Sequence, residues 1–191
     1  MPRKVNISDK MLMEKLMALF WVKGYTATTI DDLCEYTGFS KSFIYTNFGK
    51  KGIFEEAFFF YMENYTDPFL QALNDDDRGI DAIREKLYGL AESLVNQTMP
   101  KACLFVNTVV EMGNKEKDFT ELNEMYCGRV AEMYSRKIKY CIKLGEISNI
   151  GAVPLYTNIL MNLLFSLSVL YKTHNLDDLK RFIDAQLELL V

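Results

Sequence analysis

Side chains that can donate hydrogen bonds to a nucleic acid are concentrated between residues 40 and 51 of the sequence. An ammonium group such as that of Lys41 can donate to guanine O6 and N7, or to a phosphate. Hydroxyl groups can reach base edges or phosphates, and the amides at a helix N-terminus also bind phosphate. The residues here with this chemistry are Ser40, Lys41, Ser42, Tyr45, Thr46, Lys50 and Lys51.

Two short helices joined by a tight turn are predicted to hold these side chains, within residues 27–51. Thr28 and Thr29 are expected as N-cap residues, because an aspartate follows each of them three positions later. Ser40 is expected to cap the second helix. The small residue, turn glycine and buried aliphatic residue of a helix-turn-helix would be Cys34, Gly38 and Ile44, with Cys34 buried. Helix-turn-helix units also occur as packing motifs in helical bundles, so the pattern alone leaves DNA binding and packing both open.

The segment from Ser8 to Phe54 resembles the N-terminal domain of the tetracycline-repressor (TetR) family of bacterial regulators. The matching residues are, in order, Phe20, Gly24, Tyr25, Thr28, Thr29, Ile30, Asp32, Leu33, Gly38, Phe39, Ser40, Lys41, Ile44, Tyr45, Phe48 and Lys51. The resemblance implies base or groove contacts from Lys41, Ser42, Phe43, Tyr45 and Thr46. It implies phosphate contacts from Thr29, Tyr45, Asn47 and Lys51.

Two positions depart from the pattern of that family. Phe43 stands where the family usually has a small or polar residue, so a thymine methyl group is its expected partner. After Lys51 the chain reads Gly-Ile-Phe, where the family usually has an acidic residue, any residue, Leu and Phe. The register of the next helix, and the choice between Lys50 and Lys51, therefore remain open.

Charge is distributed unevenly over the 191 residues. Residues 1–52 hold eight Lys and Arg against five acidic residues, a net charge of +3, whereas the remainder carries −7. A basic head on an acidic body is typical of a protein that contacts a polyanion at one end. Apolar residues make up 49% of the chain, enough for a sizeable core.

Few residues of the chain could carry out catalytic or metal chemistry. The four cysteines match no zinc spacing, and His174, the single histidine, is expected at a helix end. We recognise no nucleophile motif and no phosphate-binding glycine-rich loop. The three aspartates at 75–77 could line a metal loop, but a solvated turn is favoured because no calcium-loop spacing follows. The sequence predicts no enzyme, no metal and no cofactor.

The cellular location is expected to be the cytoplasm. We recognise no signal peptide at the N-terminus, so the cysteines are expected to be reduced.

Hydrophobic periodicity predicts an all-α protein of about nine helices. Besides the two short helices, the expected helices cover residues 8–23, 51–74, 80–96, 101–113, 119–144, 155–171 and 177–191. Ser8 is expected to cap the first of them, Pro68 to kink the second near its end, and Pro100 to open the helix at 101–113. The polar face of 119–144, which includes Lys137, is expected in solvent. We divide the chain into a DNA-binding domain (1–50) and an effector-binding and dimerisation domain (51–191).

Flexible and aromatic apolar side chains in the body are suited to a cavity for an apolar or aromatic small-molecule effector. The candidate lining residues are Phe58, Tyr61, Met62, Tyr65, Phe69, Cys103, Phe105, Met112, Tyr126, Met133 and Phe165. Each of these side chains could equally be ordinary core.

Cys103 also admits a second hypothesis. The segment Ala102-Cys103-Leu104 resembles a Gly-Cys-Leu segment in one TetR-family subgroup, and some members of that subgroup sense electrophiles through this cysteine. The neighbouring Lys101 and a helix N-terminus could activate the thiol. A buried, unreactive cysteine is the alternative.

The last two predicted helices are too apolar for the surface of one subunit. A membrane span at 155–171 is disfavoured, because this stretch is short and contains asparagine and serine. We expect the two helices to form a homodimer that binds a pseudo-palindromic double-stranded DNA operator. An effector that favours another separation of the DNA-binding heads would release the operator, as in a ligand-responsive repressor. A helical scaffold that does not bind DNA is the remaining alternative.

Overall fold

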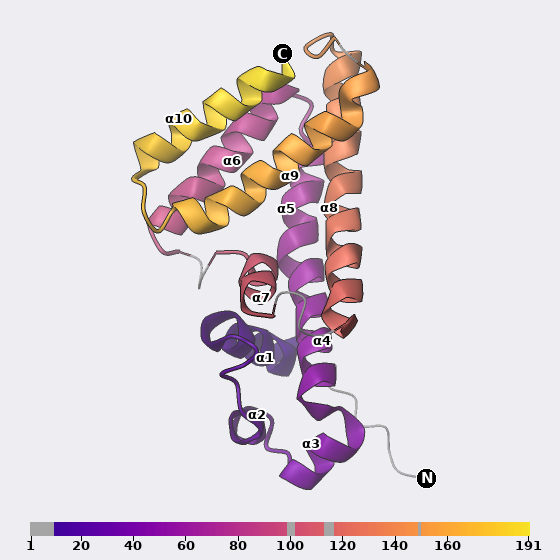
Figure 1. Cartoon of the computed structure of the whole chain (residues 1–191), viewed down its shortest axis with the longest axis vertical. Coiled ribbons are helices and arrows are strands. Elements are labelled where there is room, and N and C mark those ends of the chain that lie inside the picture. The colour runs from indigo at the N-terminus through magenta and orange to yellow at the C-terminus, as the bar shows by residue number, and fades with distance from the viewer. Residues whose placement is uncertain (1–9, 99–101, 113–116, 149) are drawn as a thin grey trace.

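The computed structural model describes residues 10–98, 102–112, 117–148 and 150–191, and all the regular elements in these ranges are helices. The predicted all-α class is therefore confirmed. Helices α1 to α3 form a small head at one end of an elongated molecule, and the C-terminal end of α10 lies at the opposite end (Figure 1). The expected helix starts at Ser8 and Pro100 lie outside the described residues.

The head consists of α1 (Lys10–Lys23), α2 (Ile30–Thr37) and α3 (Lys41–Asn47), and its ends are fixed by local hydrogen bonds. Thr29 and Asp32 form the predicted capping box of α2, and the amide of Phe43 donates to Ser40 Oγ at 3.2 Å. Gly38 ends α2 at φ 72°, a backbone conformation that glycine adopts without steric cost. Ile44 is fully buried, so α3 presents its opposite face outward.

Two predictions about the head were wrong in detail. Thr28 does not cap α2; its hydroxyl is buried and donates to the carbonyl of Gly24 at 2.7 Å, which closes the end of α1. Cys34 is half-buried rather than buried, although it packs against the core.

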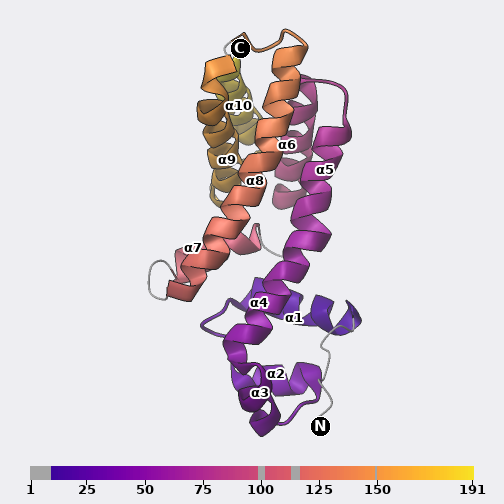
Figure 2. The same ribbon diagram turned by 90° about the vertical axis from the view of Figure 1, so that its right-hand side faces the viewer.

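A long rod connects the head to the body. It consists of α4 (Gly49–Tyr61), the π-helical turn η1 (Met62–Thr66) and α5 (Asp67–Asp75), and it rises from the head alongside α8 (Figure 2). The kink expected at Pro68 takes the form of this π turn, because proline has no amide hydrogen and its ring clashes with the carbonyl four residues earlier. Phe59 on α4 is 39% exposed, although it is a large apolar residue.

The body comprises α6 (Ile80–Val95), α7 (Leu104–Met112), α8 (Lys117–Lys143), α9 (Val153–Leu170) and α10 (Leu176–Leu187), with short 3-10 turns at Ile150–Ala152 and Glu188–Leu190. Helix α9 packs on α8, and α10 packs on α6. The short α7 lies between the head and these longer helices (Figure 1). The longer helices of the body therefore pack in layers on the side of α7 that faces away from the head.

Lys137 is buried, which contradicts the solvated face predicted for this part of α8. Only 1% of its surface is exposed, and its ammonium donates to the carbonyls of Asp76 at 2.7 Å and Arg78 at 3.0 Å. The lysine thus satisfies the backbone of the loop between α5 and α6, which explains how a charged side chain is accommodated inside.

Candidate DNA-binding helix and effector cavity

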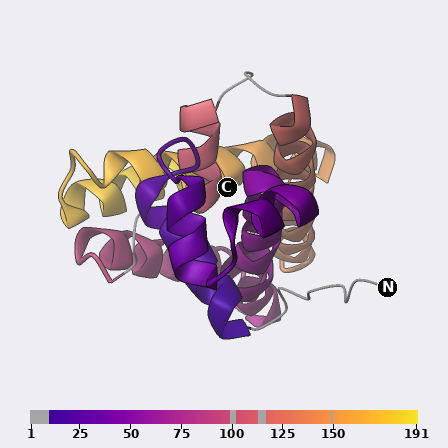
Figure 3. The same cartoon turned by 90° about the horizontal axis from the view of Figure 1, so that it is seen from below.

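Helix α3 lies at the outer end of the head, away from the body (Figure 1); seen from below, the head lies in front of the body (Figure 3). Tyr45 is 66% exposed although it is a large aromatic residue. The other exposed members of the predicted contact set are Thr29, Ser40, Lys41, Ser42, Thr46 and Asn47. Because Ile44 anchors α3 inward, these side chains form a polar surface around the helix.

Lys41 is the principal cation of this surface. Its ammonium lies 2.6 Å from a carboxylate oxygen of Asp31, and the hydrogen bond to this carboxylate raises the pKa of Lys41. Both side chains are more than half exposed, so water screens the pair. The ammonium can therefore exchange the aspartate for a phosphate or a guanine edge at little cost.

The remaining predicted contact residues make contacts within the protein. Lys50 donates to the carbonyl of Thr26 at 3.2 Å and lies over the ring of Tyr25, and Lys51 pairs with Glu55. Both lysines are half-buried. Phe43 is also half-buried, and its ring packs on Phe39 and Phe48. Direct DNA contact by Lys50, Lys51 or Phe43 stays a prediction.

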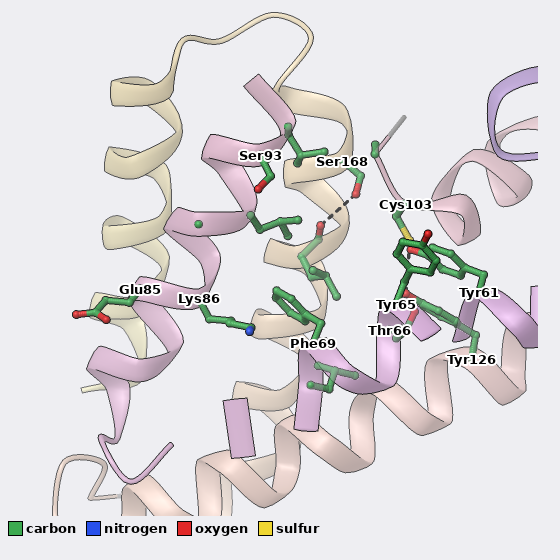
Figure 4. Close-up of a pocket in the computed structure, with 16 residues that line it drawn as sticks. Tyr61, Tyr65, Thr66, Phe69, Glu85, Lys86, Ser93, Cys103, Tyr126 and Ser168 are labelled. Carbon is green, nitrogen blue, oxygen red and sulfur yellow. Dashed lines mark hydrogen bonds between the residues drawn. The ribbon is translucent and has the colours of Figure 1, made fainter. Parts of the chain in front are cut away.

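A cavity of about 320 Å³ lies between the rod, α6 and the start of α7 (Figure 4). Five of the predicted lining residues border it, namely Tyr61, Tyr65, Phe69, Cys103 and Tyr126. Helix α6, from which no lining residue was predicted, supplies Glu85, Lys86, Gly89, Leu90, Ser93 and Leu94. The small residues Gly89 and Ser93, four positions apart on one helix face, were the available signal.

Six predicted lining residues lie elsewhere. Phe58 and Met62 are fully buried core residues. Phe105 stacks on the Tyr126 ring with a centroid distance of 4.2 Å, and Phe165 packs on Phe105. The other two are Met112, beside Thr26, and Met133, at a shallow depression between α5 and α8.

The inner end of the cavity carries a group of hydroxyls and a thiol. The phenol of Tyr61 donates to Cys103 Sγ at 3.5 Å, and the phenol oxygen of Tyr126 lies 3.4 Å from the same sulfur. Burial raises the pKa of Tyr61 and of Tyr126 well above the ordinary tyrosine value, so both phenols keep their protons. The buried hydroxyl of Thr66 makes no hydrogen bond of good geometry among the described residues.

Helix α7 is attached to the head near both of its ends. Just before α7, the carbonyl of Ala102 accepts a hydrogen bond from Trp21 Nε1 at 3.0 Å. Near its C-terminal end, the Glu111 carboxylate accepts hydrogen bonds from the amides of Tyr25 and Thr26. Cys103 lies between these attachments, so the cavity is mechanically connected to the segment that follows α1.

Glu111 can approach this closely because residue 24 is glycine. A Cβ atom at Gly24 would lie 2.8 Å from Glu111 Oε2, and the residue has φ 86°. Gly24 therefore serves both to end α1 and to admit the carboxylate.

In the described part of the chain, no cluster of three or more His, Cys, Asp or Glu side chains could hold a metal ion.

The all-α fold and the exposed second helix of the helix-turn-helix are features of a class of DNA-binding proteins. Residues 12–57 match the family described as bacterial regulatory proteins, tetR family. The head of the chain therefore matches the DNA-binding region of TetR-family regulators, as its sequence indicated.

Comparison with known proteins gives relatives of the same kind. The chain is 27% identical over 139 residues to the biofilm operon icaADBC negative transcriptional regulator IcaR of Staphylococcus aureus, covering 70% of this chain and 73% of IcaR. It is 25% identical over 108 residues to the transcriptional repressor ComR of Escherichia coli, covering 56% of this chain and about half (51%) of ComR.

A solved structure has the same fold over the whole chain. It is a cysteine-substituted variant of the TetR-family regulator CifR in complex with 26-base-pair operator DNA, with a TM-score of 0.82, 18% identity and 100% coverage of both chains.

Proposed function

We propose that this protein is a repressor that binds a pseudo-palindromic DNA operator as a homodimer and releases it when a small apolar or aromatic molecule occupies the cavity. The observation that carries the proposal is the polar surface of α3, which exposes Lys41, Tyr45 and Thr46 at the outer end of the head. The repressor function of ComR and IcaR and the operator DNA bound to CifR support it. Such a role places the protein with the chromosome in the cytoplasm and assigns it no catalytic reaction.

In this proposal residues 1–50 form the DNA-binding domain and residues 51–191 the effector-binding and dimerisation domain. The boundary falls within α4, which begins at Gly49 and packs on α1 of the head. A displacement of the body can therefore reach the head directly through this helix, as well as through α7.

The homodimer is proposed to form through α9 and α10. Leu155 and Val169 on α9 and Leu189 after α10 are 59%, 49% and 59% exposed. A second copy of the chain would cover these apolar side chains. In the described part of the chain, α9 alone is long and apolar enough to cross a membrane, but a helix in the core of a soluble protein has the same length and composition.

Binding to operator DNA tests the proposal. Lys41→Ala and Tyr45→Ala are each expected to weaken operator affinity by about tenfold, because each removes a contact to a phosphate or a base. Fluorescence anisotropy of labelled operator DNA, recorded at several salt concentrations, measures the affinity. The affinity of the wild-type protein should fall steeply as the salt concentration rises.

Lys172→Ala and Tyr171→Ala, at the end of α9, are matched controls for the two substitutions. Wild-type affinity in both α3 variants would refute the proposed surface. If the wild-type protein does not bind the operator at all, the alternative of a helical scaffold that does not bind DNA is favoured.

A thiol sensor is a second candidate function, favoured by the position of Cys103 in the cavity wall with phenols on two sides. Alkylation of the thiol would fill the inner end of the cavity and displace α7. Cys103 is only 9% exposed, so a reagent must enter through the cavity. N-ethylmaleimide should then release the operator from the wild-type protein and leave Cys103→Ser bound; unchanged operator affinity of the alkylated protein would refute this function.

A further inference from the structure

The inner end of the cavity carries three hydroxyl groups around a single thiol. Tyr61, Tyr126 and Thr66 each carry a hydroxyl, and their surface exposures are 5%, 1% and 6%. Both phenols are directed to the sulfur of Cys103, and sulfur is a weak acceptor. An oxygen atom with two lone pairs would be a better partner for these groups than the thiol.

The Thr66 hydroxyl strengthens this conclusion independently. It borders the cavity, is buried, and makes no hydrogen bond of good geometry among the described residues, although it lies close to the phenols of Tyr61 and Tyr126. A buried hydroxyl without such a bond is unfavourable, and a ligand that pairs with it recovers part of this cost. The position of Thr66 in the π turn directs it to the same end of the cavity as the two phenols (Figure 4).

Charged groups lie elsewhere in the cavity wall. The ammonium of Lys86 lies 5.1 Å from the ring centroid of Phe69, across the cavity from Cys103, and Glu85 points away from the cavity (Figure 4). The three hydroxyls at the inner end therefore offer hydrogen-bond donors to a ligand, but no charged group of the described residues lies beside them. A carboxylate placed there would be desolvated without a cation beside it, which is unfavourable.

We propose that the cavity recognises a neutral carbonyl compound, whose oxygen accepts hydrogen bonds from Tyr61 and Tyr126 and whose apolar body lies against Tyr65, Phe69 and Leu90. This inference rests on the cavity being the effector site of the proposed function. A volume of about 320 Å³ is near the lower limit for small-molecule sites, so the ligand class is that of small aryl or alicyclic ketones and aldehydes. Recognition is by hydrogen bonding and requires no covalent step.

Matched probes test the inference. Acetophenone, ethylbenzene and benzoate have nearly the same shape, but only acetophenone carries a neutral carbonyl group. Isothermal titration calorimetry on the full-length wild-type protein should give an affinity for acetophenone at least about tenfold above those for ethylbenzene and benzoate, because two hydrogen bonds to a buried oxygen are gained.

Removal of single hydroxyls then locates the site. Tyr61→Phe and Tyr126→Phe keep the rings, and each is expected to reduce the preference for acetophenone over ethylbenzene to about threefold or less. Tyr156→Phe is the matched control, since Tyr156 on α9 is half-buried like a wall residue but does not line the cavity. Its preference should remain that of the wild type.

Each of the other outcomes overturns the inference. Equal binding of acetophenone and ethylbenzene would show a purely apolar cavity and would leave the proposed effector site standing. Tighter binding of benzoate would show an anion site. A preference retained in both phenol variants would place the carbonyl elsewhere. Absence of binding by all three probes would refute the ligand class, whereas operator binding, measured separately, would still decide the regulatory function.

Discussion

At the scale of single residues, Lys137 is a charged side chain with a structural function. Its ammonium holds the carbonyls of Asp76 and Arg78, and it lies 5.2 Å from the ring centroid of Tyr140. The hydroxyl of Tyr140 donates to the carbonyl of Asp77 in the same loop. One helix of the body thus orders the loop through which α5 reverses into α6.

Lys137→Met should therefore destabilise the protein. The substitution keeps the aliphatic chain but removes the donors to two carbonyls, so we expect a loss of about 1–3 kcal/mol in the free energy of unfolding. Urea denaturation followed by circular dichroism measures it. Lys139→Met, on an exposed face of the same helix, is the control and should change the stability little. Equal stabilities of the two variants would contradict the assigned function.

Asp32 gives the head a defined response to acid. The hydrogen bond from Lys23, with those from the backbone and hydroxyl of Thr29, lowers the pKa of Asp32 from 3.8 to about 2. Because the pKa of Asp32 is lower in the folded state, its ionised carboxylate stabilises the fold above pH 3.8. This stabilisation is lost as the pH falls toward 2. Asp32→Asn should remove this part of the pH dependence of unfolding, whereas Glu35→Gln on the same helix should retain it. Parallel curves for wild type and Asp32→Asn between these pH values would count against the capping box as its origin.

At the scale of elements, α7 is the connection between cavity and head. Its start is linked to Trp21 through Ala102, and its end to the segment after α1 through Glu111. Trp21 also packs on Tyr61 and Tyr65 of the cavity wall, with centroid distances of 5.0 and 5.2 Å. A ligand that displaces these rings can act on α1 directly, which is the kind of coupling that a regulator requires.

Glu111→Gln should loosen this connection. The carboxylate accepts from two amides, whereas a carboxamide has a single acceptor oxygen, so one amide loses its partner. A loss of about 1.4 kcal/mol corresponds to about tenfold faster hydrogen exchange at Tyr25 or Thr26. NMR-detected exchange measures it, with Glu124→Gln, exposed on α8, as the control. Unchanged exchange at both amides would mean that Glu111 does not hold the head.

At the scale of the whole molecule, the rod and the layers of the body place the head at one end and the C-terminal helices at the other (Figures 1 and 2). A dimer formed through α9 and α10 would carry two heads, and the rod would fix their separation. A ligand that changes the separation of the heads would then change the affinity of the dimer for the operator.

Val169→Glu and Leu189→Glu should each disrupt the proposed dimer, because a carboxylate would be buried without a partner. Light scattering coupled to size-exclusion chromatography should show a shift from the dimer mass to the 22.1 kDa monomer. Leu144→Glu, at an exposed position at the end of α8, is the control and should remain dimeric. A wild-type protein that is already monomeric would refute the interface.

The sequence by itself determined the elements that depend on neighbours a few residues apart. The capping box of Thr29 and Asp32, the cap at Ser40 and the left-handed glycine at 38 are local hydrogen bonds and backbone preferences, so the helix-turn-helix could be predicted from its residues. The buried face of α6 likewise follows from the spacing of its apolar residues.

Only the tertiary structure decided which side chains meet across long sequence distances. Glu111 and Tyr25 are 86 residues apart, and Trp21 and Ala102 are 81 apart. Burial of Lys137 and the division of the aromatic residues between cavity and core likewise depend on how α5, α6 and α8 pack. Helical periodicity states which face of a helix is apolar, but not which neighbour covers that face or where the packing leaves a space.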